Sequence, residues 1–147
     1  MTEESNNKDN NFVFSLNIKS DKSNQVNNHS TEMILSQCMT YFLQGKRAYE
    51  ANNTDKAIEL FQQAIKFLEK GKINNSDSAI FYTYLGLSAQ KKGWHSFANA
   101  QFLYALKLNP KDEVAKNNVD LYSKNSMKKV YTSDRIRDFL KKIFKNK

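Results

Sequence analysis

Apolar residues recur at three- and four-residue steps along most of this chain, a spacing typical of one face of a helix. Two stretches follow it closely: Ala57, Leu60, Phe61, Ala64, Ile65 and Leu68, and then Ala98, Phe102, Ala105 and Leu106. We therefore predict an all-α fold. Six helices are expected, over residues 31–51, 55–70, 78–91, 95–108, 113–124 and 134–145.

Turn-forming and capping residues separate these helices. Residues 52–55, with the sequence Asn-Asn-Thr-Asp, break the pattern and offer a cap for the next helix. Gly93 suits a left-handed turn position between two helices. Pro110 is expected to end the fourth helix, and Asp112 is a suitable cap for the fifth.

The same order of aromatic, small and aliphatic residues occurs twice, at a shift of 41 residues. The first copy has Tyr41, Gly45, Ala48, Ala57, Phe61, Ala64 and Ile65. The second copy has Tyr82, Gly86, Ala89, Ala98, Phe102, Ala105 and Leu106. Small residues let two helix backbones approach, and large residues fill the space beside them. The duplication therefore predicts two helical hairpins with the same packing.

These residues resemble the tetratricopeptide repeat, a helix–turn–helix unit of about 34 residues. The second copy, over 79–112, matches best through Tyr82, Leu85, Gly86, Ala89, Ala98, Phe102, Ala105 and Pro110. The first copy, over about 38–70, departs at Gln44, where the family has leucine, and at Glu69, where it has proline. Extra residues follow, and we expect a longer second helix and a loose loop over 71–78. The resemblance implies a short α-solenoid that binds other proteins.

Two repeats are fewer than the three that usually form a stable stack. We expect residues 31–124 to form the domain, with the helix over 113–124 acting as a degenerate third repeat that caps the second. The helix near the C-terminus could also cover an end of the stack. Self-association into a homo-oligomer is the alternative.

The resemblance also implies where a partner binds, because the first helix of each hairpin lines a concave groove in this family. Helix phase then gives the groove positions as Phe42, Leu43, Lys46, Tyr49 and Glu50, followed by Tyr84, Leu87, Gln90 and Lys91. Aromatic residues mixed with lysines suit an extended peptide with apolar side chains and some negative charge. The alternative is that other segments of the chain cover Phe42, Leu43 and Leu87.

Residues 132–147 are expected to contain a basic amphipathic helix. Its apolar stripe consists of Ile136, Phe139, Leu140, Ile143 and Phe144. Its cations are Arg135, Arg137, Lys141, Lys142 and Lys145. We expect this stripe to pack on the repeats as a cap. Two other roles stay open, which are attachment to an anionic membrane surface and contact with a partner protein or nucleic acid.

The charge of the chain is concentrated at this end. The 147 residues have a formal net charge of +8, and the eight basic and two acidic residues of 128–147 contribute +6. The excess therefore belongs to a tail element and not to a basic domain. Aromatic residues occupy repeat positions and do not alternate with a basic patch, so nucleic acid is not the partner that we expect.

The first thirty residues are rich in Asn and Ser, a composition that predicts disorder. Phe12, Phe14, Leu16 and Ile18 alternate with other residues in this tail, so the segment either docks in the groove or is a chance feature. We expect no secretory signal and no membrane span. The single cysteine, Cys38, fits a cytoplasmic protein and a buried structural position.

The sequence contains no motif for catalysis, for a cofactor or for a metal ion. We therefore expect a non-enzymatic interaction module, such as an adaptor or an assembly factor. A scaffold attached to a membrane through the basic helix is one alternative. A second is a photosystem-assembly type of repeat protein, which the size and two-repeat layout resemble through generic repeat residues only.

Overall fold

The computed structural model describes residues 28–132 and 134–145, and all of their regular elements are helices. In chain order these are α2 (Asn28–Glu50), α3 (Thr54–Lys70), the short 3₁₀ helix η1 (Ser76–Ser78), α4 (Ala79–Lys92), α5 (His95–Leu108), α6 (Glu113–Thr132) and α7 (Asp134–Lys145). The all-α prediction is confirmed for this part of the chain. The prediction that the first thirty residues are disordered is wrong for 28–30, which form the start of α2. Residues 1–27, with the segment 12–18, lie outside the described residues.

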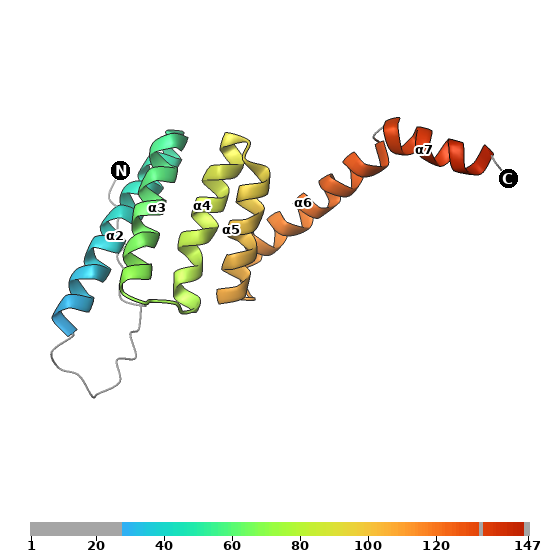
Figure 1. Cartoon of the computed structure of the whole chain (residues 1–147). Helices are drawn as coiled ribbons and strands as arrows, with labels where there is room; N and C mark the ends of the chain where they lie inside the picture. The colour runs from blue at the N-terminus through green and yellow to red at the C-terminus, as the bar shows by residue number, and fades with distance from the viewer. Residues whose placement is uncertain (1–27, 133, 146–147) are drawn as a thin grey trace.

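Four helices, α2 to α5, lie side by side as two consecutive hairpins (Figure 1). The α2–α3 hairpin packs on the α4–α5 hairpin mainly through α3 and α4. Next, α6 packs against α5 and then leads away from the bundle, and α7 lies at its far end (Figure 1). Helix α6 thus covers the open side of the second hairpin, as expected of a capping helix, but only along part of its length.

The core is divided between the two hairpins. In the first hairpin the rings of Phe42, Phe61 and Phe81 meet, with the centroids of Phe42 and Phe81 4.5 Å apart. In the second, Phe102 packs among alanines, one of which is Ala115 of α6. Burial of apolar surface is the main term that stabilises such helix packing. The periodic pattern selected part of each cluster, such as Phe61 and Phe102, whereas Phe42, Phe81 and Ala115 join the core from other helices.

The duplication in the sequence is also present in the contacts. A Cβ atom built on Gly45 would lie 2.7 Å from Cε1 of Phe61, and one built on Gly86 would lie 2.7 Å from Cε1 of Phe102. Each glycine is in the first helix of a hairpin and each phenylalanine in the second. The missing side chain therefore lets the two helices approach in the same way in both hairpins.

The turns inside the two hairpins match as well. Asn52 and Gly93, 41 residues apart, have positive φ angles of 57° and 87°. The next amide in each turn bonds back to the preceding helix, from Asn53 N to Ala48 O and from Trp94 N to Ala89 O, both at 2.9 Å. The prediction that Gly93 adopts a left-handed conformation is confirmed.

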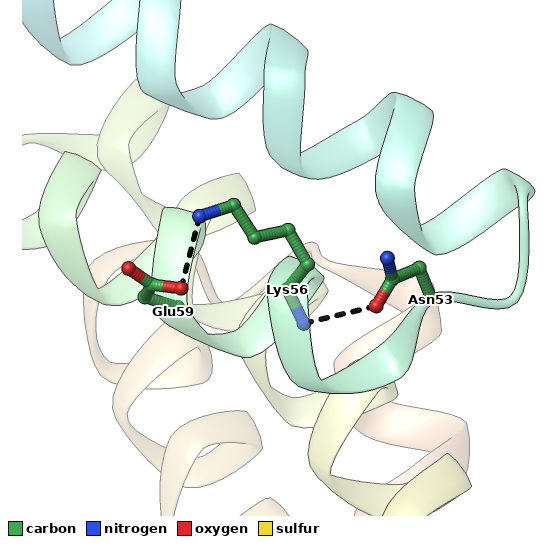
Figure 2. A network of polar contacts seen from close by, with 3 residues as sticks. All are labelled: Asn53, Lys56 and Glu59. Carbon is green, nitrogen blue, oxygen red and sulfur yellow. Dashed lines mark hydrogen bonds and ion pairs between the residues drawn. The ribbon is translucent and has the colours of Figure 1, made fainter.

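The helix starts differ in their side-chain caps. Asn53 Oδ1 accepts a hydrogen bond from Lys56 N at 3.3 Å, and Lys56 Nζ reaches Glu59 Oε2 at 3.0 Å (Figure 2). At the start of α6, Asp112 Oδ1 accepts from Ala115 N at 3.0 Å, and its other oxygen accepts from the hydroxyl of Thr83 in α4. The predicted caps at these two helices are therefore present, and Asp112 also joins α6 to α4.

Two expectations about the C-terminal part are wrong. Helix α6 continues to Thr132 and does not end at residue 124, because no glycine or proline interrupts residues 113–132. Helix α7 does not cap the repeats, since it packs on α6 at a distance from the two hairpins (Figure 1).

The loop over 71–78 is more ordered than expected, because it contains η1 and because Ile73 packs on the first core cluster.

Candidate functional site

Four of the predicted groove residues come together where α2 and α4 are adjacent. We call this surface, formed by Lys46, Tyr49, Tyr84 and Lys91, the α2–α4 face. The rings of Tyr49 and Tyr84 meet edge to face with centroids 5.9 Å apart. Lys91 Nζ lies 3.7 Å from the centroid of the Tyr49 ring, and Lys46 Nζ lies 5.9 Å from that of Tyr84. The face thus combines aromatic surface with positive charge.

Hydrogen bonds hold this face in place. Lys91 Nζ donates to the carbonyl oxygen of Tyr49 at 3.3 Å and to Oδ1 of Asn52 at 3.2 Å. The adjacent Lys92 forms an ion pair with Asp55 at the start of α3. The C-terminal end of α4 is therefore fixed to the turn between α2 and α3, although each exposed contact alone contributes little to stability.

Phe42 does not belong to an open groove. Its side chain is 1% exposed, and its ring contacts those of Phe61, Phe81 and Tyr84. The expectation that Phe42 lines the groove is wrong, and the alternative, that the chain itself covers this residue, is correct. Helix spacing explains the burial, because Phe42 lies one turn from the buried Cys38 and from Gly45, on the same side of α2.

The other predicted groove positions differ in accessibility. Leu43 and Leu87 are half-buried, and Leu87 packs against the second core cluster. Glu50 and Lys91 are exposed. Gln90 is half-buried and lines a cavity on the side of α4 that faces α6. Of the predicted groove residues, Gln90 therefore lies at the cavity, whereas Lys46, Tyr49, Tyr84 and Lys91 form the α2–α4 face.

The cavity beside Gln90 has a volume of about 480 Å³ and lies where α6 leads away from α4 and α5. We call it the amide cavity, because side-chain amides from three helices line it. Its lining consists of Gln90 from α4, of His95, Ala98, Asn99 and Phe102 from α5, and of Asn118, Leu121, Tyr122, Asn125 and Ser126 from α6. Its floor is apolar at Ala98 and Phe102, which are both buried.

One polar atom in this cavity has no partner. Oδ1 of Asn99 is buried and accepts no hydrogen bond from any residue that the structure describes. In contrast, Nδ2 of Asn118 donates to Val114 O at 2.8 Å, and the hydroxyls of Tyr122 and Ser96 are 3.2 Å apart. A buried unpaired acceptor costs about 1–3 kcal/mol, so Asn99 carries a polar group that the described fold leaves unsatisfied beside this cavity.

This cavity was not predicted from the sequence. A signal for it was present, because Asn118, Tyr122 and Asn125 follow each other at steps of three and four residues and thus lie on one side of α6. This polar row was not distinguished from a solvated helix face. Its role depends on the angle at which α6 leaves α5, and that angle is a property of the tertiary structure.

Two titratable groups of the described helices have raised pKa values. Burial raises the pKa of the Cys38 thiol to about 12, and its Sγ donates to Ala64 O at 3.3 Å. Burial, followed by the nearby Tyr104, raises the pKa of Tyr82 to about 12. A thiol with a raised pKa is a poor nucleophile near neutral pH. In the described ranges, no three His, Cys, Asp or Glu residues are arranged to hold a metal ion.

Helix α7 presents a second candidate surface. Phe139, Leu140, Ile143 and Phe144 are exposed, and we call these four residues the α7 stripe. Ile136, which the sequence placed with them, is half-buried, while Lys141 and Lys142 are exposed. None of the described helices has the length and apolar character needed to cross a membrane.

Comparison with known proteins gives the chain no family. No protein-family model, no curated protein and no solved structure matches it.

Proposed function

We propose that this chain is a non-enzymatic interaction module of the tetratricopeptide type, which binds an extended segment of a partner protein in the amide cavity. The observation that carries the proposal is the cavity itself, an opening of about 480 Å³ between three helices with an apolar floor and polar walls. Ligand sites in proteins have volumes of about 300–1,000 Å³ and combine apolar surface with a few placed polar groups.

Two features support the repeat type of fold, and hence a short α-solenoid. The contact between glycine and phenylalanine recurs with the same geometry in both hairpins, at Gly45 and Gly86. The turn inside each hairpin also recurs, with its positive φ angle and its backbone bond. Helix α6 would then be the first helix of an incomplete third repeat, so the cavity lies beside two successive first helices, α4 and α6. Gln90 is the lining residue that the resemblance places in the groove, whereas the floor at Ala98 and Phe102 comes from the second helix α5, so the cavity would adjoin the groove of the family.

The lining of the cavity favours a peptide as the ligand. A peptide backbone has an N–H donor and a carbonyl acceptor at each residue, and the amides of Gln90, Asn99 and Asn125 can pair with both. The apolar floor at Phe102 would take an aliphatic or aromatic side chain.

The α2–α4 face would extend this site. Gln90 lines the cavity, and the next residue, Lys91, lies on the face. Lys46 and Lys91 give that face positive charge, so a ligand with acidic residues next to an apolar anchor would suit both surfaces. Such a module would act as an adaptor or an assembly factor. Its one thiol, buried at Cys38, is in keeping with a reducing compartment such as the cytoplasm.

The test is a selection of peptides from a displayed random library on the full chain. Recovered peptides are then titrated into the intact chain, a Leu121→Arg variant and a Leu103→Arg variant. Leu121 lines the cavity and is 50% exposed, whereas Leu103 lies outside it and is 49% exposed. The two variants therefore match in residue type and exposure, and differ in position.

We expect the selected peptides to share an apolar residue. They should bind the Leu121→Arg variant at least about tenfold more weakly than the intact chain, or by about 1.4 kcal/mol, and should bind the Leu103→Arg variant like the intact chain. The proposal would be contradicted if no peptide is enriched over an unrelated helical protein. Equal affinity for both variants would contradict it as well, because the cavity would then not be the binding site.

A further inference from the structure

Helix α7 carries an apolar surface that no part of the described chain covers. Phe144 is 72% exposed and Phe139 is 61% exposed, while Leu140 and Ile143 are also open to solvent. The two hairpins do not approach this surface, because α6 holds α7 away from them (Figure 1). Large apolar side chains gathered on one exposed face indicate an interaction surface.

The charges of α7 are arranged around this stripe. With 3.6 residues per turn, Arg137 and Lys141 follow one edge of the stripe and Lys142 follows the other, while Lys145 lies opposite. Arg137, Lys141, Lys142 and Lys145 are all exposed. The acidic Asp138 lies on the side of α7 away from the stripe. The border of the apolar face is thus positive on both sides.

We propose that α7 docks on the surface of a membrane that contains anionic lipids, with its axis in the plane of the interface. The α7 stripe would enter the boundary between headgroups and acyl chains, and the flanking cations would reach up to the headgroup phosphates. The concentration of basic residues over 128–147, with a net charge of +6, is complementary to such a surface.

The flanking charges distinguish this occupant from a second copy of the chain. Two α7 helices that paired through their stripes would bring Lys and Arg of one copy beside Lys and Arg of the other, and like charges at the borders of a helix pair disfavour pairing. A lipid surface has the opposite sign and meets both borders at once. Helix α6 would serve as the arm: its 20 residues span about 30 Å, so the amide cavity would remain accessible.

The experiment is co-sedimentation of the full chain with vesicles of phosphatidylcholine alone and with vesicles that also contain phosphatidylserine. Four variants are compared with the intact chain. Ile143→Ser with Phe144→Ser alters the stripe, and Lys141→Gln with Lys142→Gln alters its border. The matched controls are Leu103→Ser with Val114→Ser, and Lys116→Gln with Lys124→Gln, at exposed positions outside α7.

We expect binding to the vesicles with phosphatidylserine, weak binding to phosphatidylcholine alone, and a decrease as salt is added. Both α7 variants should lose at least about tenfold in partition coefficient, and both controls should bind like the intact chain. No binding to phosphatidylserine vesicles would overturn the proposal. Self-association that the stripe variant abolishes, without vesicle binding, would overturn it in favour of a second copy. Peptide binding in the cavity should be unchanged in the α7 variants, which keeps this test independent of the function proposed above.

Discussion

The ring of Phe102 lies directly against the backbone of Gly86, where a Cβ atom would come within 2.7 Å of Cε1 of that ring. Phe102 is fully buried, so its ring has little room to move. Gly45 and Phe61 repeat the relationship 41 residues earlier. These two contacts set the distance between the helices of each hairpin, and they connect the duplicated sequence to a duplicated structure.

The first prediction concerns Gly86→Ala. In an ordinary helix interior this change stabilises by about 1 kcal/mol, because alanine has the higher helix propensity. Here the new Cβ would clash with Phe102, and overpacking of this kind costs about 1–3 kcal/mol. We expect a net loss of stability in urea denaturation, and a loss of similar size for Gly45→Ala.

A double variant checks the cause of that loss. Phe102→Leu shortens the side chain that the new methyl group meets, so Gly86→Ala should cost less in the Phe102→Leu background than in the intact chain. A Gly86→Ala variant that is more stable than the intact chain would show that the two helices are not in close contact at this position.

The second prediction compares the two matching turns. Gly93 has a φ angle of 87° and no atom within 4 Å of the position of a Cβ, so the cost of Gly93→Ala is a backbone cost only. A left-handed conformation costs a residue with a side chain about 1–2 kcal/mol. We expect Gly93→Ala to lower the melting temperature. Asn52→Gly, at the matching position with a φ angle of 57°, relieves the backbone cost but also removes the exposed bond from Lys91, so it should lower the melting temperature less than Gly93→Ala or not at all. A larger decrease for Asn52→Gly than for Gly93→Ala would contradict the equivalence of the turns.

The third prediction concerns the reactivity of Cys38. Its thiol is fully buried and burial raises its pKa to about 12, so the folded protein contains almost no accessible thiolate near neutral pH. Iodoacetamide should leave the native chain unmodified over a period in which the urea-unfolded chain reacts completely, as measured by mass spectrometry. Fast labelling of the native chain would indicate that α2 does not pack on α3 as described.

The fourth prediction concerns stability at alkaline pH. The pKa of Tyr82 rises from 10.0 to about 12 on folding, first because of burial and then because of Tyr104, whose ring centroid is 4.5 Å away. The contribution of Tyr82 to stability is therefore complete below pH 10 and is lost as the pH rises through the range from 10 to 12. Urea denaturation across this range should show a smaller loss for Tyr82→Phe than for the intact chain. If the intact chain and the Tyr82→Phe variant lose the same stability across this pH range, Tyr82 is not the group whose ionisation lowers the stability.

The helices of this chain could be predicted because local signals agree. The period of apolar residues gives the helix faces, and Asn53, Gly93 and Asp112 mark the ends where the structure has caps or turns. The burial of Phe42 was harder to predict from the sequence. It lies at a groove position by family resemblance and at a core position by its spacing from Cys38, and tertiary packing decides between the two.

The C-terminal part shows what local patterns omit. Residues 113–132 contain many Lys and Asn and few apolar residues, so their pattern gave no reason to extend the helix beyond residue 124. The angle of α6 creates the amide cavity, and that angle depends on a few contacts, such as Ala115 in the second core cluster. The amphipathic character of α7 could be predicted, but the surface that it covers could not, because a stripe does not specify its partner.

The central claim is that the amide cavity binds a peptide segment of a partner. Amide hydrogen exchange of the full chain, with and without a peptide from the library selection, tests it most directly. We predict slower exchange in the C-terminal half of α4 and in residues 113–126 of α6 when the peptide is bound, and no such change in the Leu121→Arg variant at the same peptide concentration. If bound peptide leaves the exchange rates of both α4 and α6 unchanged, the peptide does not bind in the amide cavity.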